Sequence, residues 1–179
     1  MLKINNSTLN AQFFNRPTLK VARDLPGKYL CCRIKGRILS QPLVEVEAYD
    51  GFCDKASHAH RGPTTRNAVM FGPAGYWYVF LCYGMHWMLN IVTGPKEYPA
   101  AILIRSAGEY SGPGRLTKAL QINKIFNGKK ISRANGLWVE DRGVTVHKKD
   151  LKRMPRVGIN YAGPIWKKKP YRFIWDPNA

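Results

Sequence analysis

The sequence predicts an α+β protein: a single domain over residues 1–179, with a curved, open barrel-like antiparallel β-sheet, short surrounding helices and one protruding β-hairpin. Its 179 residues are 45% hydrophobic, which is enough for one well-filled core and too little for two. Most apolar and β-branched residues fall in short runs between turn formers, as antiparallel strands require. Helical spacing is confined to short segments, so we expect the sheet to dominate.

The first half of the chain predicts one helix, a strand meander and a long loop. An early Pro17 and the closing pair Pro26-Gly27 delimit a short helix over residues 16–24. Three strands rich in β-branched and apolar residues follow, over 28–34, 36–40 and 42–49. The segment 50–75 is rich in Gly, Pro, Ser, Thr and His, so we expect a loop there with one helical turn near 65–68. Loops of this kind often carry function.

The second half begins with the clearest pair of strands. Residues 76–82 and 86–92 predict a hairpin joined at Tyr83-Gly84-Met85, where Gly84 permits a tight reversal. A glycine-rich turn at 111–114 precedes an amphipathic helix expected over 115–122. The remaining strands, separated in part by the basic stretches 148–153 and 167–169, are expected at 100–105, 136–140, 156–159 and 171–175.

The charge of the chain indicates a polyanionic partner. The sequence has 29 Lys and Arg against 11 Asp and Glu, a formal net charge of +18. An excess of this size would strain a compact fold by self-repulsion unless a polyanion normally neutralises part of it. We therefore expect nucleic-acid binding. Composition alone leaves a ribosomal or other structural RNA-associated protein open as the alternative.

Neither a targeting segment nor a standard metal motif is evident. The residues after Met1 lack an apolar stretch long enough for a signal peptide, and no later run is long enough to span a membrane. We expect an intracellular protein, in the cytoplasm or nucleoid of a bacterium or the nucleus of a eukaryote. The four cysteines have no C-x-x-C spacing, and His58 with His60 matches no zinc pattern, so we expect no metal and no cofactor.

Acidic residues are scarce, yet four of the eleven fall within ten residues: Glu45, Glu47, Asp50 and Asp54. In a strand over 42–49, alternation places Glu47 mid-strand, facing away from Val46 and Ala48. A carboxylate held rigidly in a positive field stays ionised at neutral pH, as a base that deprotonates water must be. The alternative is a structural Glu paired with one of the many basic residues.

The predicted hairpin is rich in aromatic residues, and its tip is the unusual position. Alternation separates Tyr76, Tyr78 and Phe80 from Trp77, so one face can pack inward while the other offers rings for stacking. Tyr83 falls at the turn, where a large ring could wedge between base pairs. The alternative is an ordinary exposed tyrosine.

A second candidate contact with nucleic acid lies after the glycine-rich turn. Gly112-Pro113-Gly114 opens the expected helix, whose free backbone N–H groups could bind a phosphate beside Arg115 and Lys118. The spacing of a Walker loop is absent, and a plain helix start explains the pattern equally well.

Several of these motifs recur together in one known family. Taken in order over residues 19–174, the sequence resembles the alkyladenine (3-methyladenine) DNA glycosylases that initiate base-excision repair. The motifs that carry the resemblance are Glu45-Val46-Glu47-Ala48-Tyr49, Thr65-Arg66-Asn67, Met70-Phe71, Tyr83-Gly84-Met85, Ser111-Gly112-Pro113, Ala119-Leu120-Gln121-Ile122-Asn123 and Arg156-Val157-Gly158.

The resemblance implies a catalytic group and a base pocket. Glu47 looks like the general base that activates the attacking water, with Arg105 and the His58 region holding that water. Tyr49, His58 and Phe80 look like the walls that sandwich a flipped base. Phe80 stands where larger relatives have Tyr, which keeps the stacking face and loses a hydroxyl.

The resemblance also implies how DNA is held. Tyr83 resembles the residue that fills the gap left in the duplex, flanked by Met85 and by His86, which stands where a Tyr is often found. Asn90 resembles the residue that disfavours guanine by crowding its exocyclic amino group. The connection from Arg105 to Ser111 is much shorter than in larger members.

Together these residues predict a monomeric, monofunctional DNA glycosylase that acts on double-stranded DNA containing a damaged purine. It is expected to flip alkylated purines of the 3-methyladenine and 7-methylguanine type, and deaminated purines such as hypoxanthine, and to leave an abasic site. No lysine nucleophile and no membrane contact are expected. The alternatives are a non-catalytic basic RNA- or DNA-binding module and, more distantly, a metal-dependent hydrolase.

Overall fold

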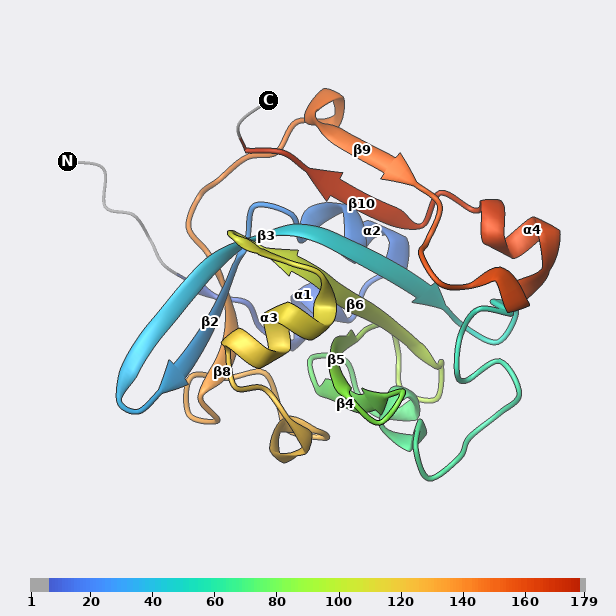
Figure 1. Cartoon of the computed structure of the whole chain (residues 1–179), viewed down its shortest axis with the longest axis horizontal. Coiled ribbons are helices and arrows are strands. Elements are labelled where there is room, and N and C mark those ends of the chain that lie inside the picture. Colours follow the sequence, from blue (N-terminus) through green and yellow to red (C-terminus); the bar gives the residue numbers. More distant parts are fainter. Residues whose placement is uncertain (1–6, 178–179) are drawn as a thin grey trace.

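A large antiparallel sheet organises the computed structural model, which describes residues 7–177 (Figure 1). Its main path runs β1-β8-β2-β3-β6-β5-β4, with β10 on β3, β9 on β10 and β7 on β6. The first part of the chain forms β1 (Ser7–Thr8), α1 (Ala11–Phe14), α2 (Thr18–Asp24), β2 (Tyr29–Ile34), β3 (Arg37–Asp50), the 3-10 helix η1 (Ala68–Phe71), β4 (Trp77–Cys82) and β5 (His86–Val92).

The second part completes the sheet and adds short helices. Its elements are β6 (Ala100–Ala107), β7 (Tyr110–Ser111), α3 (Pro113–Ala119), η2 (Lys124–Phe126), β8 (Leu137–Asp141), η3 (Lys148–Asp150), β9 (Leu151–Met154), η4 (Asn160–Ala162), α4 (Gly163–Lys168) and β10 (Arg172–Trp175). The α+β class, the open sheet that does not close into a barrel, and the few short helices confirm the predicted fold class.

The long strand β3 corrects the prediction of two strands at 36–40 and 42–49. It pairs with β2 up to Pro42 and with β6 from Leu43 onward, so the proline lies where the strand changes partner. A missing N–H is tolerated at such a point. One continuous strand therefore runs from an exposed hairpin into the centre of the sheet.

The predicted strand at 156–159 is wrong. Arg156 instead turns its side chain into the interior, and Gly158 has a φ of +76°, a left-handed conformation outside the range of regular strands. The strand forms earlier, as β9 within the basic stretch, where it pairs with β10 and exposes its Lys and Arg. Basic side chains suit such an edge because they prevent pairing with another chain.

Smaller corrections concern the helices. α3 begins at Pro113 and ends at Ala119, short of the predicted 115–122, because Gln121 takes a left-handed φ of +53°. The helical turn expected near 65–68 forms at 68–71, and the basic residues 167–168 end a helix, α4. None of the helices within residues 7–177 is both long and apolar enough to cross a membrane.

The main core positions the rest of the molecule. It joins Trp77 of β4, Ile91 of β5, Ile104 of β6 and Val46 of β3 with Phe14. α3 packs on β5 and β6, and α2 packs on β3 and β6. β3, β6 and β5 lie side by side in this sheet, and the predicted site residues Glu47 and Tyr49 lie on the face of β3 opposite to Val46.

Candidate active site

Glu47 lies near the C-terminal end of β3 and is fully buried, with no exposed side-chain surface. Its Oε1 accepts a hydrogen bond of 2.8 Å from the backbone N–H of Val157, and its Oε2 accepts one of 3.0 Å from the Tyr49 hydroxyl. Arg105 approaches Oε1 with its Nη1 at 3.4 Å. A buried carboxylate needs this kind of compensation, and these three donors fix its orientation.

Burial and charge act in opposite directions on this carboxyl. Desolvation is the largest influence and raises the pKa of Glu47 above its ordinary value, while Arg105, the Val157 N–H and the Tyr49 hydroxyl lower it. The net pKa lies above that of a free Glu, so Glu47 is a stronger base than a surface carboxylate.

A second carboxylate holds Arg105 in place. Glu45 Oε1 accepts hydrogen bonds of 2.9 Å from both Arg105 Nε and Arg172 Nη1, and its Oε2 accepts one of 2.9 Å from Ser106 Oγ. Although burial alone would raise it, the pKa of Glu45 is lowered overall by Arg172, Ser106 and Arg105. Irregular pairing of β3 with β6 at Glu45 accompanies this arrangement. The acidic cluster was visible in the sequence, but this orienting role was not.

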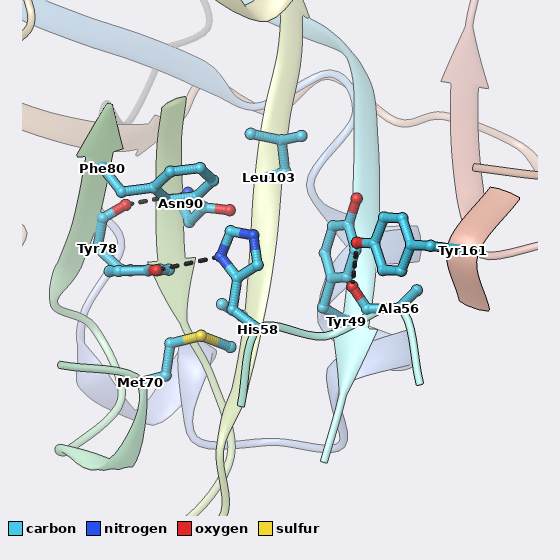
Figure 2. Close-up of a pocket in the computed structure, with 10 residues that line it drawn as sticks. Tyr49, Ala56, His58, Met70, Tyr78, Phe80, Asn90, Leu103 and Tyr161 are labelled. Carbon is cyan, nitrogen blue, oxygen red and sulfur yellow. Dashed lines mark hydrogen bonds between the residues drawn. The ribbon is translucent and has the colours of Figure 1, made fainter. Parts of the chain in front are cut away.

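A pocket opens beside Tyr49, whose hydroxyl group reaches Glu47, but neither Glu47 nor Arg105 is among the residues that line it. Figure 2 shows Tyr78, Phe80 and Asn90 on one side, Tyr49 and Tyr161 on the other, and His58 between them. All four residues predicted to contact a base line this pocket: Tyr49, His58, Phe80 and Asn90. A mainly apolar lining with a few polar groups is typical of a small-molecule or cofactor site.

His58 and Asn90 are held by specific partners. His58 Nδ1 lies 3.2 Å from the Tyr78 hydroxyl, and its ring meets Phe80 edge-on at 4.6 Å between centroids. Burial and then the nearby Arg66 lower the pKa of His58, which favours the neutral ring. Asn90 Nδ2 donates to the carbonyls of Tyr78 and Met88, at 3.1 and 3.2 Å. The amide oxygen of Asn90 turns toward the pocket (Figure 2).

Arg156 supports the Tyr49 wall from outside the pocket. Its buried guanidinium makes two hydrogen bonds to Asp54, one of them 2.8 Å from Nη2, and donates to the Ala48 carbonyl at 2.7 Å. Its Cζ lies 4.7 Å from the centroid of the Tyr49 ring. The Arg156-Val157-Gly158 motif was part of the resemblance, but its role as a buried support was not foreseen.

Tyr161 is another site residue that sequence reasoning missed. It lines the pocket and donates a 2.9 Å hydrogen bond to the carbonyl of Ala56, itself a lining residue (Figure 2). Tyr161 lies in η4, beyond the segment that we expected to be a strand. Because the predicted strand does not form, the alternation of residues in this segment gave no indication that the Tyr161 side chain faces the pocket.

The hairpin of β4 and β5 presents the predicted wedge residues to solvent. The side chains of Tyr83 and Met85 are 87% and 70% exposed, and His86 is exposed beside them. Tyr83 has a φ of +49°, an uncommon conformation for a residue with a side chain, as the turn demands. The tyrosine is thus held at the turn of the hairpin with most of its surface open to solvent.

Arg115 and Lys118 are both exposed on α3. The start of this helix lies against the hairpin, since a Cβ atom added to Gly114 would lie 3.0 Å from the His86 ring. α3 has no side-chain cap at Gly112. The structure therefore brings these basic residues beside the hairpin strand β5 without marking them as a phosphate site.

No group of three or more His, Cys, Asp or Glu side chains within residues 7–177 is arranged to hold a metal ion. His60, the partner of His58 in the sequence pattern, uses its Nδ1 in a 2.7 Å hydrogen bond with the Phe52 carbonyl. Cys31 and Cys32 are buried, and burial raises the pKa of these thiols to about 12 and about 11.

Comparison with known proteins shows an enzyme of the DNA glycosylase class, a hydrolase of N-glycosyl bonds, and the basic chain, the aromatic pocket and the buried Glu47 bonded to Tyr49 agree with that class. More narrowly, the chain belongs to the methylpurine-DNA glycosylase family, whose model matches residues 12–111 and 106–179. The predicted resemblance is thereby confirmed.

Curated relatives agree over nearly the whole chain. A protein of Methanocella arvoryzae is 42% identical over 192 residues, and the match covers 96% of this chain and 93% of the length of that protein. One from Psychrobacter cryohalolentis is 38% identical, covering 97% and 94%, and one from an Anaeromyxobacter species is 41% identical, covering 96% and 90%. All three carry the name "Putative 3-methyladenine DNA glycosylase".

Proposed function

We propose that this protein is a monofunctional glycosylase of base-excision repair that removes alkylated purines of the 3-methyladenine and 7-methylguanine type, and deaminated purines such as hypoxanthine, from double-stranded DNA. The observation that carries the proposal is the hydrogen bond between Tyr49 and Glu47, which joins the buried carboxylate of Glu47 to the wall of an aromatic pocket. The names of the relatives support the 3-methyladenine part of this range.

The reaction is a hydrolysis of the bond between the purine and C1′ of the sugar. A water oxygen forms a new bond to C1′, the C–N bond breaks, and its electron pair leaves with the base. Glu47 accepts the proton of the water. Arg105, whose Nη1 lies 3.4 Å from Glu47 Oε1, holds the water oxygen and balances the charge. The product is an abasic site, and no covalent link to the protein forms.

The pocket suits a base that leaves easily. A 3- or 7-alkylated purine is positively charged, so the faces of Tyr49 and Phe80 attract it by roughly 0.5 to 2 kcal/mol, an attraction that normal purines lack. The same charge makes the purine a good leaving group. A positioned water and a general base such as Glu47 are therefore sufficient for hydrolysis. Asn90, whose amide oxygen turns toward the pocket, disfavours guanine by crowding its exocyclic amino group.

Extrusion of the nucleotide selects damaged sites as well. Flipping costs a few kcal/mol, and least where the base is damaged or mispaired. Tyr83 at the exposed hairpin tip fills the space left in the duplex, with Met85 and His86 beside it. The basic surface, including Arg115 and Lys118, provides sequence-independent attraction to phosphates. The protein acts as a monomer inside the cell.

A lesion panel tests the proposal. Purified protein is incubated with duplexes that each carry one 3-methyladenine, 7-methylguanine, hypoxanthine or normal purine, and free base and abasic sites are quantified. We expect release of the damaged bases and one abasic site for each base released. We expect no protein–DNA adduct after borohydride treatment. A protein that binds every duplex and releases no base would instead be a non-catalytic nucleic-acid-binding module.

A further inference from the structure

A second concave surface adjoins the base pocket. It is formed by residues 55–64 of the loop after β3 and by Tyr161. Two residues of the base pocket, His58 and Tyr161, also line this groove, so the two sites are neighbours. The groove is therefore placed to contact a strand whose nucleotide enters the pocket.

The groove is lined by basic and hydroxyl side chains, the types that commonly bind phosphate. Lys55, His60 and Arg61 line it together with the hydroxyl residues Ser57 and Thr64, and no Asp or Glu is among its lining residues. Neither Lys55 nor Arg61 has an ion pair with any residue of the range 7–177. In a protein this basic, two uncompensated cations at one edge of the pocket are a ready phosphate contact.

Buried groups hold this loop in one shape. Asn67, 1% exposed, donates to the carbonyls of His58 and Gly62 at 2.9 and 3.1 Å and accepts from the Thr64 N–H at 2.6 Å. Asp54 accepts from the Ala56 N–H at 3.1 Å and is neutralised by Arg156. A surface that is ordered before binding pays less entropy when a ligand binds.

We infer that this groove binds the sugar–phosphate backbone of the damaged strand on one side of the flipped nucleotide, through Lys55 and Arg61. The inference rests on the proposed function, because it assigns a track for the strand that the base pocket serves. It implies an asymmetric footprint: phosphates on one flank of the lesion contribute more to binding than those on the other flank or on the complementary strand.

The test compares two variants of equal charge. Lys55→Gln/Arg61→Gln alters the groove, and Lys148→Gln/Lys149→Gln alters the exposed helix η3, outside the groove and the pocket. Both bind a duplex with a tetrahydrofuran abasic-site analogue, which cannot be hydrolysed, over a range of salt concentrations. For the groove variant we expect a log–log salt slope shallower than that of the control by about 2 and an affinity lower by on the order of tenfold. Equal slopes and affinities would overturn the inference.

Neutral methylphosphonates identify the strand. Placed on one flank of the damaged strand, they are expected to weaken binding by wild type and control while leaving the groove variant almost unaffected. Losses that are the same in all three proteins, or that arise only on the complementary strand, contradict the inference. Base release by wild type is measured separately: if it is absent, the proposed function fails, whereas the binding comparison still judges the groove.

Discussion

Replacing Arg156 by Gln tests how the pocket wall is supported. The change removes both hydrogen bonds to Asp54, the bond to the Ala48 carbonyl and the cation beside Tyr49, and it leaves the Asp54 carboxylate buried without its cation. Breaking a buried ion pair by removing one partner costs about 3–5 kcal/mol. For a domain of this size that corresponds to a fall in Tm of roughly 6–20 °C, at about 2–4 °C per kcal/mol.

Urea and thermal unfolding followed by circular dichroism measure the loss, with Lys152→Gln on the exposed strand β9 as the matched control. The control is expected to change the free energy of unfolding by less than about 0.5 kcal/mol. The double variant Asp54→Asn/Arg156→Gln is expected to be more stable than Arg156→Gln alone, because no carboxylate then remains unpaired. A loss below about 1 kcal/mol for Arg156→Gln would refute the reasoning, since such a loss is typical of exposed pairs.

Three further predictions concern the site. Because the pKa of Glu47 is raised, base release should fall in acid at a pH above the ordinary pKa of a Glu side chain. The protein should also lose stability relative to Glu47→Gln as pH rises from the ordinary Glu pKa to the raised pKa of Glu47. Paired pH–rate and melting profiles would show both effects. Tyr49→Phe removes a hydrogen bond to Glu47 and should lower single-turnover rates about tenfold while base stacking persists; an unchanged rate would exclude this role. Tyr83→Ala should keep the salt dependence of DNA binding and lose most preference for lesion duplexes; equal discrimination would contradict the wedge.

Local patterns in the sequence predicted much of the site. Alternation along one strand placed Glu45, Glu47 and Tyr49 on the same face, and the structure joins Tyr49 to Glu47 directly. The aromatic hairpin and its exposed tip at Tyr83 followed from strand and turn signals. These features depend on residues a few positions apart, so the chain itself carries the information.

The contacts that could not be predicted join distant segments. Asp54 and Arg156 are 102 residues apart, and the Val157 N–H that binds Glu47 is 110 residues from it. Arg156 reads as part of a strand by composition, whereas burial beside Asp54 and the left-handed Gly158 set its conformation. Only tertiary packing determines such partners, and the spacing of apolar and polar residues along the sequence does not predict that packing.

Single-turnover release of 3-methyladenine by Glu47→Gln tests the central claim most directly, with Glu109→Gln, an exposed residue outside the pocket, as the control. Gln keeps the size of the side chain and cannot accept the proton of the water. The expected result is a rate at least about 100-fold below wild type for Glu47→Gln, unchanged lesion binding and full activity for the control. Base release by Glu47→Gln at the wild-type rate would contradict the assignment of Glu47 as the general base.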